Sequence, residues 1–263
     1  MNHSLRNFLI LVFLLATQNA WSAAPDIARI KAAAEAGDRD AQYLYGTSIY
    51  LTKPDEKIAW IRKSAEQGHP LAQYELGEYH LRYRSGKQGL KNRRLAILWW
   101  SRSAMQGVAK AQARISNAYL SEATIPRNEV NAYIWMSLAV KSEPPFPLGN
   151  PNIYRERLKI IVPKISSASV TEAEAILRTF RIGDLKGHNP IEAELVFSQL
   201  ALQGIIESND EKVAAVNGTR IRREETRTFD LDTGPATFLC EAITSKSVGL
   251  RIVGTPFVRT LGN

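Results

Sequence analysis

Cysteine is the scarcest residue type in this sequence of 263 residues, in which Cys240 stands alone. A single cysteine cannot form an internal disulfide bond, so no disulfide framework is expected to hold the fold together. Cys240 directly follows the apolar pair Phe238-Leu239. These neighbours favour a small buried side chain over a reactive thiol.

Catalytic signatures are missing as well. The sequence contains no Gly-x-Ser-x-Gly, Ser-x-x-Lys, His-Glu-x-x-His or Cys-x-x-Cys motif and no glycine-rich phosphate-binding loop. His69 and His80 are expected at the surface near the two ends of one helix, and no further ligand joins them in a metal-binding pattern. Acidic residues are scattered, although two of them could still meet in space. We therefore expect no catalytic, metal or cofactor site and a protein that is not an enzyme.

Long hydrophobic runs are confined to the N-terminus. Residues 8–16 are all apolar, Arg6 precedes them, and Ala20-Trp21-Ser22 offers a small-x-small cleavage site. This order is typical of a secretory signal peptide, and the run is shorter than the ~20 residues of a membrane-spanning helix. The prediction is a signal peptide at residues 1–22 and a periplasmic or secreted mature protein. An uncleaved membrane anchor is the alternative.

Positive charge is in excess, since 34 Lys and Arg residues face 26 Asp and Glu residues and leave a net charge of +8. In a cytoplasmic protein this surplus would suggest nucleic acid as a partner. In an exported protein it favours acidic protein surfaces, acidic glycans or anionic lipids. Nucleic acid is therefore not an expected partner.

Two short motifs recur along the first half of the chain. One begins Ala-Gln, with a Gly four residues before it and, in two of three copies, a Gly five residues after it. The other begins with Trp and, in two of three copies, ends eight residues later at a Gly. The recurring positions are Ala41, Ala72 and Ala111; Gly46 and Gly77; Trp60, Trp99 and Trp135; and Gly68 and Gly107.

These motifs predict pairs of short helices that stack on one another. Small and apolar residues fall on one face at helical spacing, and Gly68 and Gly107 suit a helix end that needs a left-handed residue. One such pair cannot bury its apolar face alone, whereas stacked copies can. We interpret the recurring Trp residues as core side chains, and not as ligand contacts.

The pattern resembles the Sel-one-like repeats, relatives of the tetratricopeptide repeats, over about residues 26–142. The segment Lys63-Ser64-Ala65-Glu66-Gln67-Gly68 carries the resemblance most clearly. The third copy departs from it, because Ser116 and Glu143 stand where glycines are expected, so the array is expected to end there. The resemblance implies a curved solenoid that acts as an adaptor for other proteins, often in bacterial envelopes or signalling assemblies.

A basic segment between the two helices of the second repeat is the candidate binding site. It contains no acidic residue and six cations: Arg82, Arg84, Lys87, Lys91, Arg93 and Arg94. Arg is suited to bidentate contacts with carboxylate or phosphate. The alternative is a solvated loop near a helix start, where cations oppose the helix dipole.

The remainder of the chain predicts capping helices and then strands. The prolines in residues 143–151 end any preceding helix. Three further helices are expected, at 153–165, 169–180 and 191–202, and a capping box from Thr171 is expected to open the second of them. From residue 201 the runs become short and β-branched, and Asn217-Gly218 is a strong hairpin signal. Five or six strands of an antiparallel sheet or partial barrel are expected.

Residues 201–263 also resemble the periplasmic C-terminal domain of general secretion pathway protein B and of related pilus-biogenesis proteins. The resemblance lies in Gly204-Ile205-Ile206, in Ala215 to Gly218, and in the Val248–Leu250 and Gly254–Leu261 segments, although Glu224-Glu225 stands where Glu-Gly is usual. It implies a partner in a type II secretion or pilus assembly. The alternative is an unrelated small β module with an Asn-Gly turn.

Together these patterns predict an α+β fold, with a helical solenoid and capping helices followed by a small β domain. The expected divisions are a signal peptide at 1–22, repeats at 23–142, a proline-rich break with capping helices at 143–200 and the β domain at 201–263. The functional prediction is an exported, non-catalytic scaffold or adaptor for other envelope proteins. The alternative is a binder of cell-wall glycan or anionic lipid that uses residues 82–94.

Overall fold

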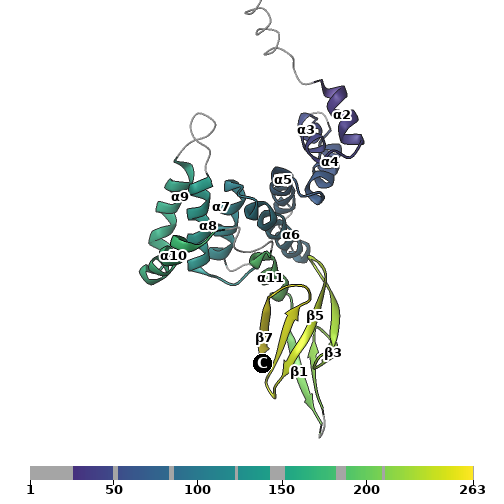
Figure 1. Cartoon of the computed structure of the whole chain (residues 1–263), viewed down its shortest axis with the longest axis vertical. Coiled ribbons are helices and arrows are strands. Elements are labelled where there is room, and N and C mark those ends of the chain that lie inside the picture. The colour runs from purple at the N-terminus through teal and green to yellow at the C-terminus, as the bar shows by residue number, and fades with distance from the viewer. Residues whose placement is uncertain are drawn as a thin grey trace, which may run out of the picture. The chain divides into compact units, whose positions relative to one another are not determined.

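The computed structural model describes residues 26–49, 53–82, 86–121, 124–142, 152–181, 188–208 and 211–262. The expected signal peptide at 1–22 and the proline-rich residues 143–151 lie outside these ranges. The fold is α+β, and the chain forms two compact units, residues 1–67 and residues 68–263 (Figure 1).

The described part of the first unit contains three helices: α2 (Ile27–Glu35), α3 (Arg39–Ser48) and α4 (Pro54–Glu66). Asp38 caps α3, its carboxylate accepting a hydrogen bond from the Ala41 N–H at 2.7 Å. A Cβ on Gly46 would lie 3.2 Å from the Cβ of Trp60, so this glycine allows α3 and α4 to approach closely. Trp60 is half-buried and contacts Tyr45 edge to face.

The helices of the second unit follow one another as α5 (Pro70–Leu81), α6 (Gly86–Met105), α7 (Ala109–Ser121), α8 (Glu129–Ser142), α9 (Ile153–Ile161), a 3₁₀ turn η1 (Val162–Lys164) and α10 (Ser167–Thr179). Helix α5 packs on α6 and α7 packs on α8, while α9 and α10 both pack against α8. The predicted core positions Ala72, Ala111, Trp99 and Trp135 are all buried. Two stacked helix pairs with further helices on the last one are thus the framework of this unit.

Glycine ends the repeats as predicted. Gly68 and Gly107 have φ of 88° and 84°, a left-handed conformation that other residues adopt only with strain. Pro70 then occupies the first turn of α5, and the Nδ1 of His69 accepts a hydrogen bond from the Ala72 N–H. The expectation that His80 lies at the surface was wrong, because it shares the buried face of α5 with Leu76.

The ends of two later helices differ from the sequence prediction. Helix α10 begins at Ser167 and is capped by Ser166, whose hydroxyl accepts from the Ser169 N–H at 3.1 Å. Thr171 lies inside the helix, where its hydroxyl donates to the Ser167 carbonyl, so the capping box was assigned wrongly. Helix α11 (Pro190–Phe197) is capped by Asn189 and ends before Leu202, the first residue of a strand.

Two antiparallel sheets form the C-terminal part, called here the β module (residues 202–262). The first has the order β1 (Leu202–Glu207), β2 (Lys212–Val216), β3 (Thr219–Arg222), and the second β4 (Thr226–Leu231), β5 (Gly234–Ile243), β6 (Ser247–Ile252), β7 (Val258–Gly262). The described residues thus hold seven strands where five or six were expected. Asn217 and Gly218 have φ of 47° and 78°, which confirms the predicted hairpin.

The two sheets share one core. Val216 and Ile221 of the first sheet pack with Phe238 and Leu250 of the second, and all four are fully buried. Cys240 lies in the same cluster, and burial raises the pKa of its thiol. The sequence interpretation of Cys240 as a small buried side chain is therefore confirmed.

Helix α11 joins the helices to the β module (Figure 1). Its Ile191 and Leu195 belong to the core of the helical part, whereas Ala193 and Phe197 belong to the core of the β module. Because both faces are covered, six of its eight residues are apolar, and its two acidic residues, Glu192 and Glu194, contact Arg102 and Tyr119 of the repeats. This helix fixes where the β module meets the repeats.

Candidate partner-binding site

The basic segment at 82–94 is mostly helical, and the sequence prediction of a loop was wrong. Helix α6 begins at Gly86, so Lys91, Arg93 and Arg94 lie on its first turns, while Arg82 caps the end of α5. Gln88 donates to Asn92 one turn later, a contact that supports the early helix. Lys, Gln, Leu and Arg are good helix formers and outweigh the cost of Gly89. Arg84 and the side chain of Lys87 lie outside the described part.

The cations of this segment differ in their exposure and in their contacts within the protein. Arg94 pairs with Asp232 of the β module and is therefore engaged inside the protein. Arg82 and Lys91 are exposed, and Arg93 is half-buried. Binding of acidic glycan or lipid by this segment stays a prediction, and Arg94 is the member least free to take part.

Further polar contacts hold α11 and the β module against the repeats. Arg102 of α6 forms a bidentate pair with Glu192, with Nη2–Oε1 and Nε–Oε2 distances of 2.7 and 3.3 Å. The amide of Asn189 donates to the Ser101 hydroxyl at 2.8 Å. Together with the Arg94–Asp232 pair, these contacts fix the joint at the middle and at the C-terminal part of α6.

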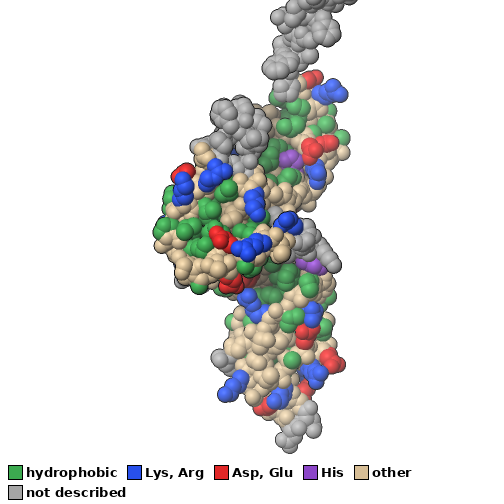
Figure 2. Space-filling view, turned by 60° about the vertical axis from the view of Figure 1, so that its left-hand side comes forward, with side chains coloured by type: hydrophobic (Ala, Val, Ile, Leu, Met, Phe, Trp, Pro, Cys, Tyr) green, Lys and Arg blue, Asp and Glu red, His purple; other side chains and the backbone are tan. Residues whose placement is uncertain are grey.

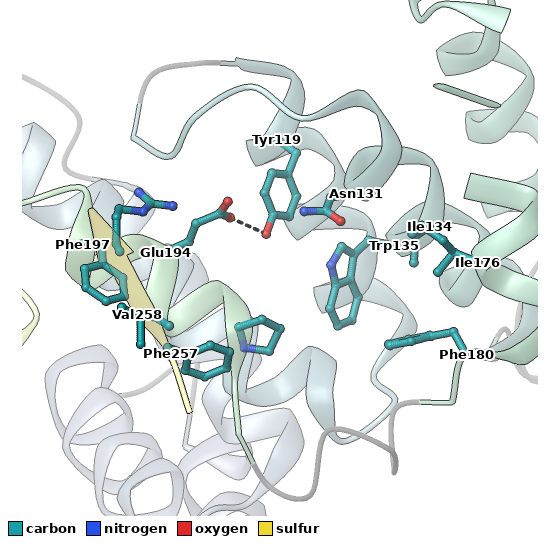
Figure 3. A pocket seen from close by; sticks show the side chains of 13 residues that line it. Tyr119, Asn131, Ile134, Trp135, Ile176, Phe180, Glu194, Phe197, Phe257 and Val258 are labelled. Carbon is teal, nitrogen blue, oxygen red and sulfur yellow. Dashed lines mark hydrogen bonds between the residues drawn. The ribbon is translucent and has the colours of Figure 1, made fainter. Parts of the chain in front are cut away.

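A pocket of about 330 Å³ opens at this joint (Figure 3). We call it the junction pocket. Its walls come from α7, α8 and α10 on the helical side and from α11 and β7 on the other side. The aromatic side chains around it are Tyr119, Trp135, Phe180, Phe197 and Phe257. A cavity of this size and composition is typical of ligand and anchor-residue sites.

Polar groups line one edge of the junction pocket. Tyr119 is 2% exposed, and its hydroxyl donates to Glu194 Oε2 at 2.7 Å (Figure 3). Burial, together with the negative charge of Glu194, raises the pKa of Tyr119 far above its ordinary range, so the phenol remains a neutral donor. Asn131 also lies at this edge.

Arg259 adds a positive group to the same pocket. Its guanidinium lies 5.4 Å from the centre of the Phe197 ring, an arrangement that favours a cation over an aromatic face. Among the residues that the structure describes, no carboxylate lies within ion-pair distance of Arg259. The acceptor Glu194, the donor Arg259 and the amide of Asn131 therefore border an apolar cavity.

The sequence alone did not reveal the junction pocket. Trp135 was correctly predicted to be buried, at 4% exposed, but its contribution to a pocket wall depends on α10 and α11. Tyr119 and Glu194 are 75 positions apart, so no local pattern links them. The sequence feature that could have indicated the pocket was the set of aromatic and proline residues outside the repeats, namely Phe180, Pro190, Phe197 and Phe257.

The described residues hold no group of three or more His, Cys, Asp or Glu side chains able to bind a metal ion. Within the same ranges, no helix combines the length and the apolar character needed to cross a membrane. The geometry of the junction pocket suits the binding of a ligand or of a partner's side chain.

Comparison with known protein families shows which repeat family forms the helical part of the chain. The family model of the Sel1 repeat matches residues 31–69, 70–108 and 109–142. The helical array is built of Sel1 repeats. The matched segments contain the helix pairs α3–α4, α5–α6 and α7–α8, as the sequence pattern predicted, and the first segment also includes the end of α2.

Individual relatives match only in part. Chitin synthase regulatory factor 3 of Schizosaccharomyces pombe is 35% identical over 94 residues, which is 35% of this chain and 9% of the yeast protein. Two solved structures are similar to the chain. The protective antigen c5321 of uropathogenic Escherichia coli, which has an SLR fold, matches with a TM-score of 0.48 and 22% identity over 70% of this chain and 38% of its own. A Sel1 repeat protein from Oxalobacter formigenes matches with a TM-score of 0.42 and 26% identity over 52% of this chain and 98% of its own.

Sel1 repeats mediate protein–protein interaction, and their scaffold is generally non-catalytic. Proteins are the partners that Sel1 repeats generally bind.

Proposed function

We propose that this protein is an exported, non-catalytic adaptor that holds an envelope protein at the joint between its Sel1 array and its β module. One observation carries the proposal: the walls of the junction pocket come from both parts. Neither part alone would form it. A partner bound there would contact the repeats and the β module together.

The chemistry of the pocket suits a hydrophobic side chain on a polypeptide. The apolar walls end in an exposed rim, where Ile176 is 37% and Val258 is 45% exposed. Aromatic pockets with such rims are where anchor residues of partners bind most strongly. Glu194 can accept from a main-chain N–H, and Arg259 can donate to a main-chain carbonyl, so both polar groups of a peptide find a counterpart.

The envelope location rests on sequence features. Residues 1–22 have the order of a secretory signal, and residues 201–263 resemble a periplasmic domain of the general secretion pathway. Both support a partner within a secretion or pilus assembly. Cell fractionation and N-terminal sequencing test this part, and the mature chain is expected to begin at Ala23.

Crosslinking in cells, followed by capture from the envelope fraction, tests the adaptor function. The full chain is compared with the double variant Ile176→Glu/Val258→Glu, which places charge at the rim of the junction pocket. The matched control is Ile206→Glu, since Ile206 is a 53% exposed strand residue that does not line the pocket. Loss of captured envelope proteins by at least about tenfold is expected for the double variant only. Equal capture by all three chains would contradict the proposal.

A further inference from the structure

A second hollow lies on the helical part, away from the junction pocket. Its volume is about 520 Å³, and α7, the segment before α8, α9 and η1 surround it. We call it the basic hollow, because Arg114, Arg127, Arg157 and Lys164 line it. Figure 2 brings the α9–α10 side of the molecule forward and shows Lys and Arg side chains among hydrophobic ones there.

Two of the four cations are fixed by acidic partners. Arg114 makes a bidentate contact with Glu78, with Nε–Oε1 and Nη2–Oε2 distances of 2.8 and 2.6 Å. Arg127 pairs with Glu129 at 3.0 Å and also donates to the main-chain carbonyls of Leu120 and Lys164. These two guanidinium groups are held in place and form rigid walls.

The other two cations have no such partner. Within the described ranges, no carboxylate lies within ion-pair distance of Arg157 or Lys164. The guanidinium of Arg157 lies 5.7 Å from the centre of the Tyr154 ring and is otherwise exposed. The basic hollow therefore carries two positive charges that its own acidic residues do not neutralise.

Apolar side chains lie between these charges. Leu120 and Ile161 belong to the lining, and Ile160 is 59% exposed at its edge. An exposed isoleucine beside unneutralised cations favours a ligand that is both acidic and apolar. Inorganic phosphate would gain nothing from the apolar lining, and a lipid bilayer would need a flatter and larger apolar face.

We propose that the basic hollow binds an acidic segment of a partner protein in which a hydrophobic side chain neighbours two carboxylates. The carboxylates contact Arg157 and Lys164, and the hydrophobic side chain covers Ile160 and Leu120. The inference rests on the proposed adaptor function and names the chemistry of a second contact. Because exposed charges are screened by salt, binding must weaken as ionic strength rises.

Fluorescence anisotropy with the purified mature chain tests the proposal. The probe is a labelled peptide, Glu-Leu-Glu-Glu-Leu-Glu, and its partner probe carries Gln at every Glu position. The acidic probe is expected to bind at least about tenfold more tightly than the Gln probe at low salt, and the difference should shrink toward 0.5 M salt. No difference between the probes at about 1 mM, the weak end of specific binding, overturns the proposal.

Matched variants locate the site. Arg157→Glu/Lys164→Glu is expected to lower the affinity for the acidic probe at least about tenfold. Arg178→Glu/Lys246→Glu makes the same charge change at exposed residues outside the basic hollow and should leave most of the affinity. Equal losses in both variants would show unspecific attraction to a basic protein and overturn the proposal.

Two further measurements separate the possible ligands. Vesicles containing phosphatidylglycerol should bind the full chain and the Arg157→Glu/Lys164→Glu variant equally. If the variant loses vesicle binding but keeps its affinity for the acidic probe, the ligand is a lipid and the proposal is wrong. The junction-pocket variant Ile176→Glu/Val258→Glu should bind the acidic probe normally. If that variant still captures envelope proteins, the proposed function fails while the basic hollow stands.

Discussion

The second and third Sel1 repeats have the same two-helix plan but different polar contacts. Within the second repeat, Gln106 donates to Gln73 Oε1 at 2.8 Å, and the buried hydroxyl of Ser103 donates to the Pro70 carbonyl at 2.7 Å. Gly77 leaves room for the indole of Trp100. These contacts link the two helices of the repeat to each other.

The third repeat lacks two of these internal links. Ser142 stands at the position of Gln106, and Ala139 stands at the position of Ser103. Gln112, the counterpart of Gln73, is fully buried, and its Oε1 has no hydrogen-bond partner in the described part of the chain. One internal link remains, since the Ser116 hydroxyl donates to the Ala132 carbonyl at 2.6 Å. Two other polar contacts of this repeat lead outward, from Tyr119 to Glu194 of α11 and from Tyr133 to Glu174 of α10. Both repeats contact non-repeat elements, but the comparison teaches that the last repeat keeps fewer internal links and uses its tyrosines to hold α10 and α11 at the junction pocket.

The largest effect is expected at Gly77. A Cβ at this position would lie 2.5 Å from Trp100 Cδ1, so Gly77→Val forces the indole out of its place. Overpacking of this kind lowers the free energy of unfolding by about 3 kcal/mol. Chemical denaturation monitored by Trp fluorescence measures the loss.

Gly204→Val is the control for this change, because nothing lies within 4 Å of a Cβ at Gly204. Its effect should stay within about 0.5 kcal/mol, as for most surface substitutions. Similar losses in both variants would mean that the close approach of α5 and α6 does not limit the residue at position 77.

The next effect is expected at Tyr119, the first outward contact. Tyr119→Phe removes a buried hydroxyl that donates to a carboxylate, and such hydrogen bonds contribute about 2 kcal/mol. The unfolding free energy should fall by that amount, and Tyr133→Phe, whose hydroxyl contacts Glu174 at 3.1 Å, should cost less. If the order of the two losses is reversed, the α7–α11 contact is not the main anchor of the joint.

The hydrogen bond between Gln106 and Gln73 can be removed from the second repeat, and its counterpart can be added to the third repeat. Gln106→Ser abolishes the amide that donates to Gln73 and should cost about 1 kcal/mol. Ser142→Gln offers the same amide to the buried Oε1 of Gln112 and should raise stability by up to about 1 kcal/mol. Thermal unfolding of both variants measures the changes. A destabilising Ser142→Gln would show that the third repeat cannot accept the link of the second.

The sequence predicted those features that depend on local spacing. The buried Ala positions, Trp99 and Trp135, the left-handed Gly68 and Gly107, and the Asn217-Gly218 hairpin follow from periodicity and backbone preference. Trp60, also predicted to lie in the core, is only half-buried. Helix ends were less predictable, because they depend on single hydrogen bonds such as that of Ser166 to the Ser169 N–H.

The candidate sites could not be predicted in this way. The glycines at 86 and 89 favoured a loop, yet helix α6 begins at Gly86 and continues through Gly89. The junction pocket and the basic hollow each combine side chains from segments far apart in the chain. Such convergence follows from packing between elements, which residue spacing does not encode.

The smallest effect at neutral pH is expected at Glu129, the first residue of α8 and a further outward contact of the third repeat. Its carboxylate accepts from the Ser166 N–H at 2.8 Å and from the Ser169 hydroxyl at 3.1 Å, and it pairs with Arg127. The hydrogen bond from Ser166, followed by that from Arg127, lowers the pKa of Glu129 from 4.5 to about 2.

A lowered pKa in the folded state means that the unfolded chain takes up the proton first as the pH falls. The stabilisation by Glu129 is therefore complete above about pH 4.5 and is lost between pH 4.5 and about pH 2. Glu129→Gln should be less stable than the natural chain at pH 7, and this difference should shrink across that window. Glu172→Gln, an exposed residue of α10, provides the control and should change stability little at any pH. If the loss of stability caused by Glu129→Gln is equal at pH 7 and pH 3, the carboxylate does not link α8 to the start of α10. The outward contacts of the third repeat would then rest on Tyr119 and Tyr133 alone.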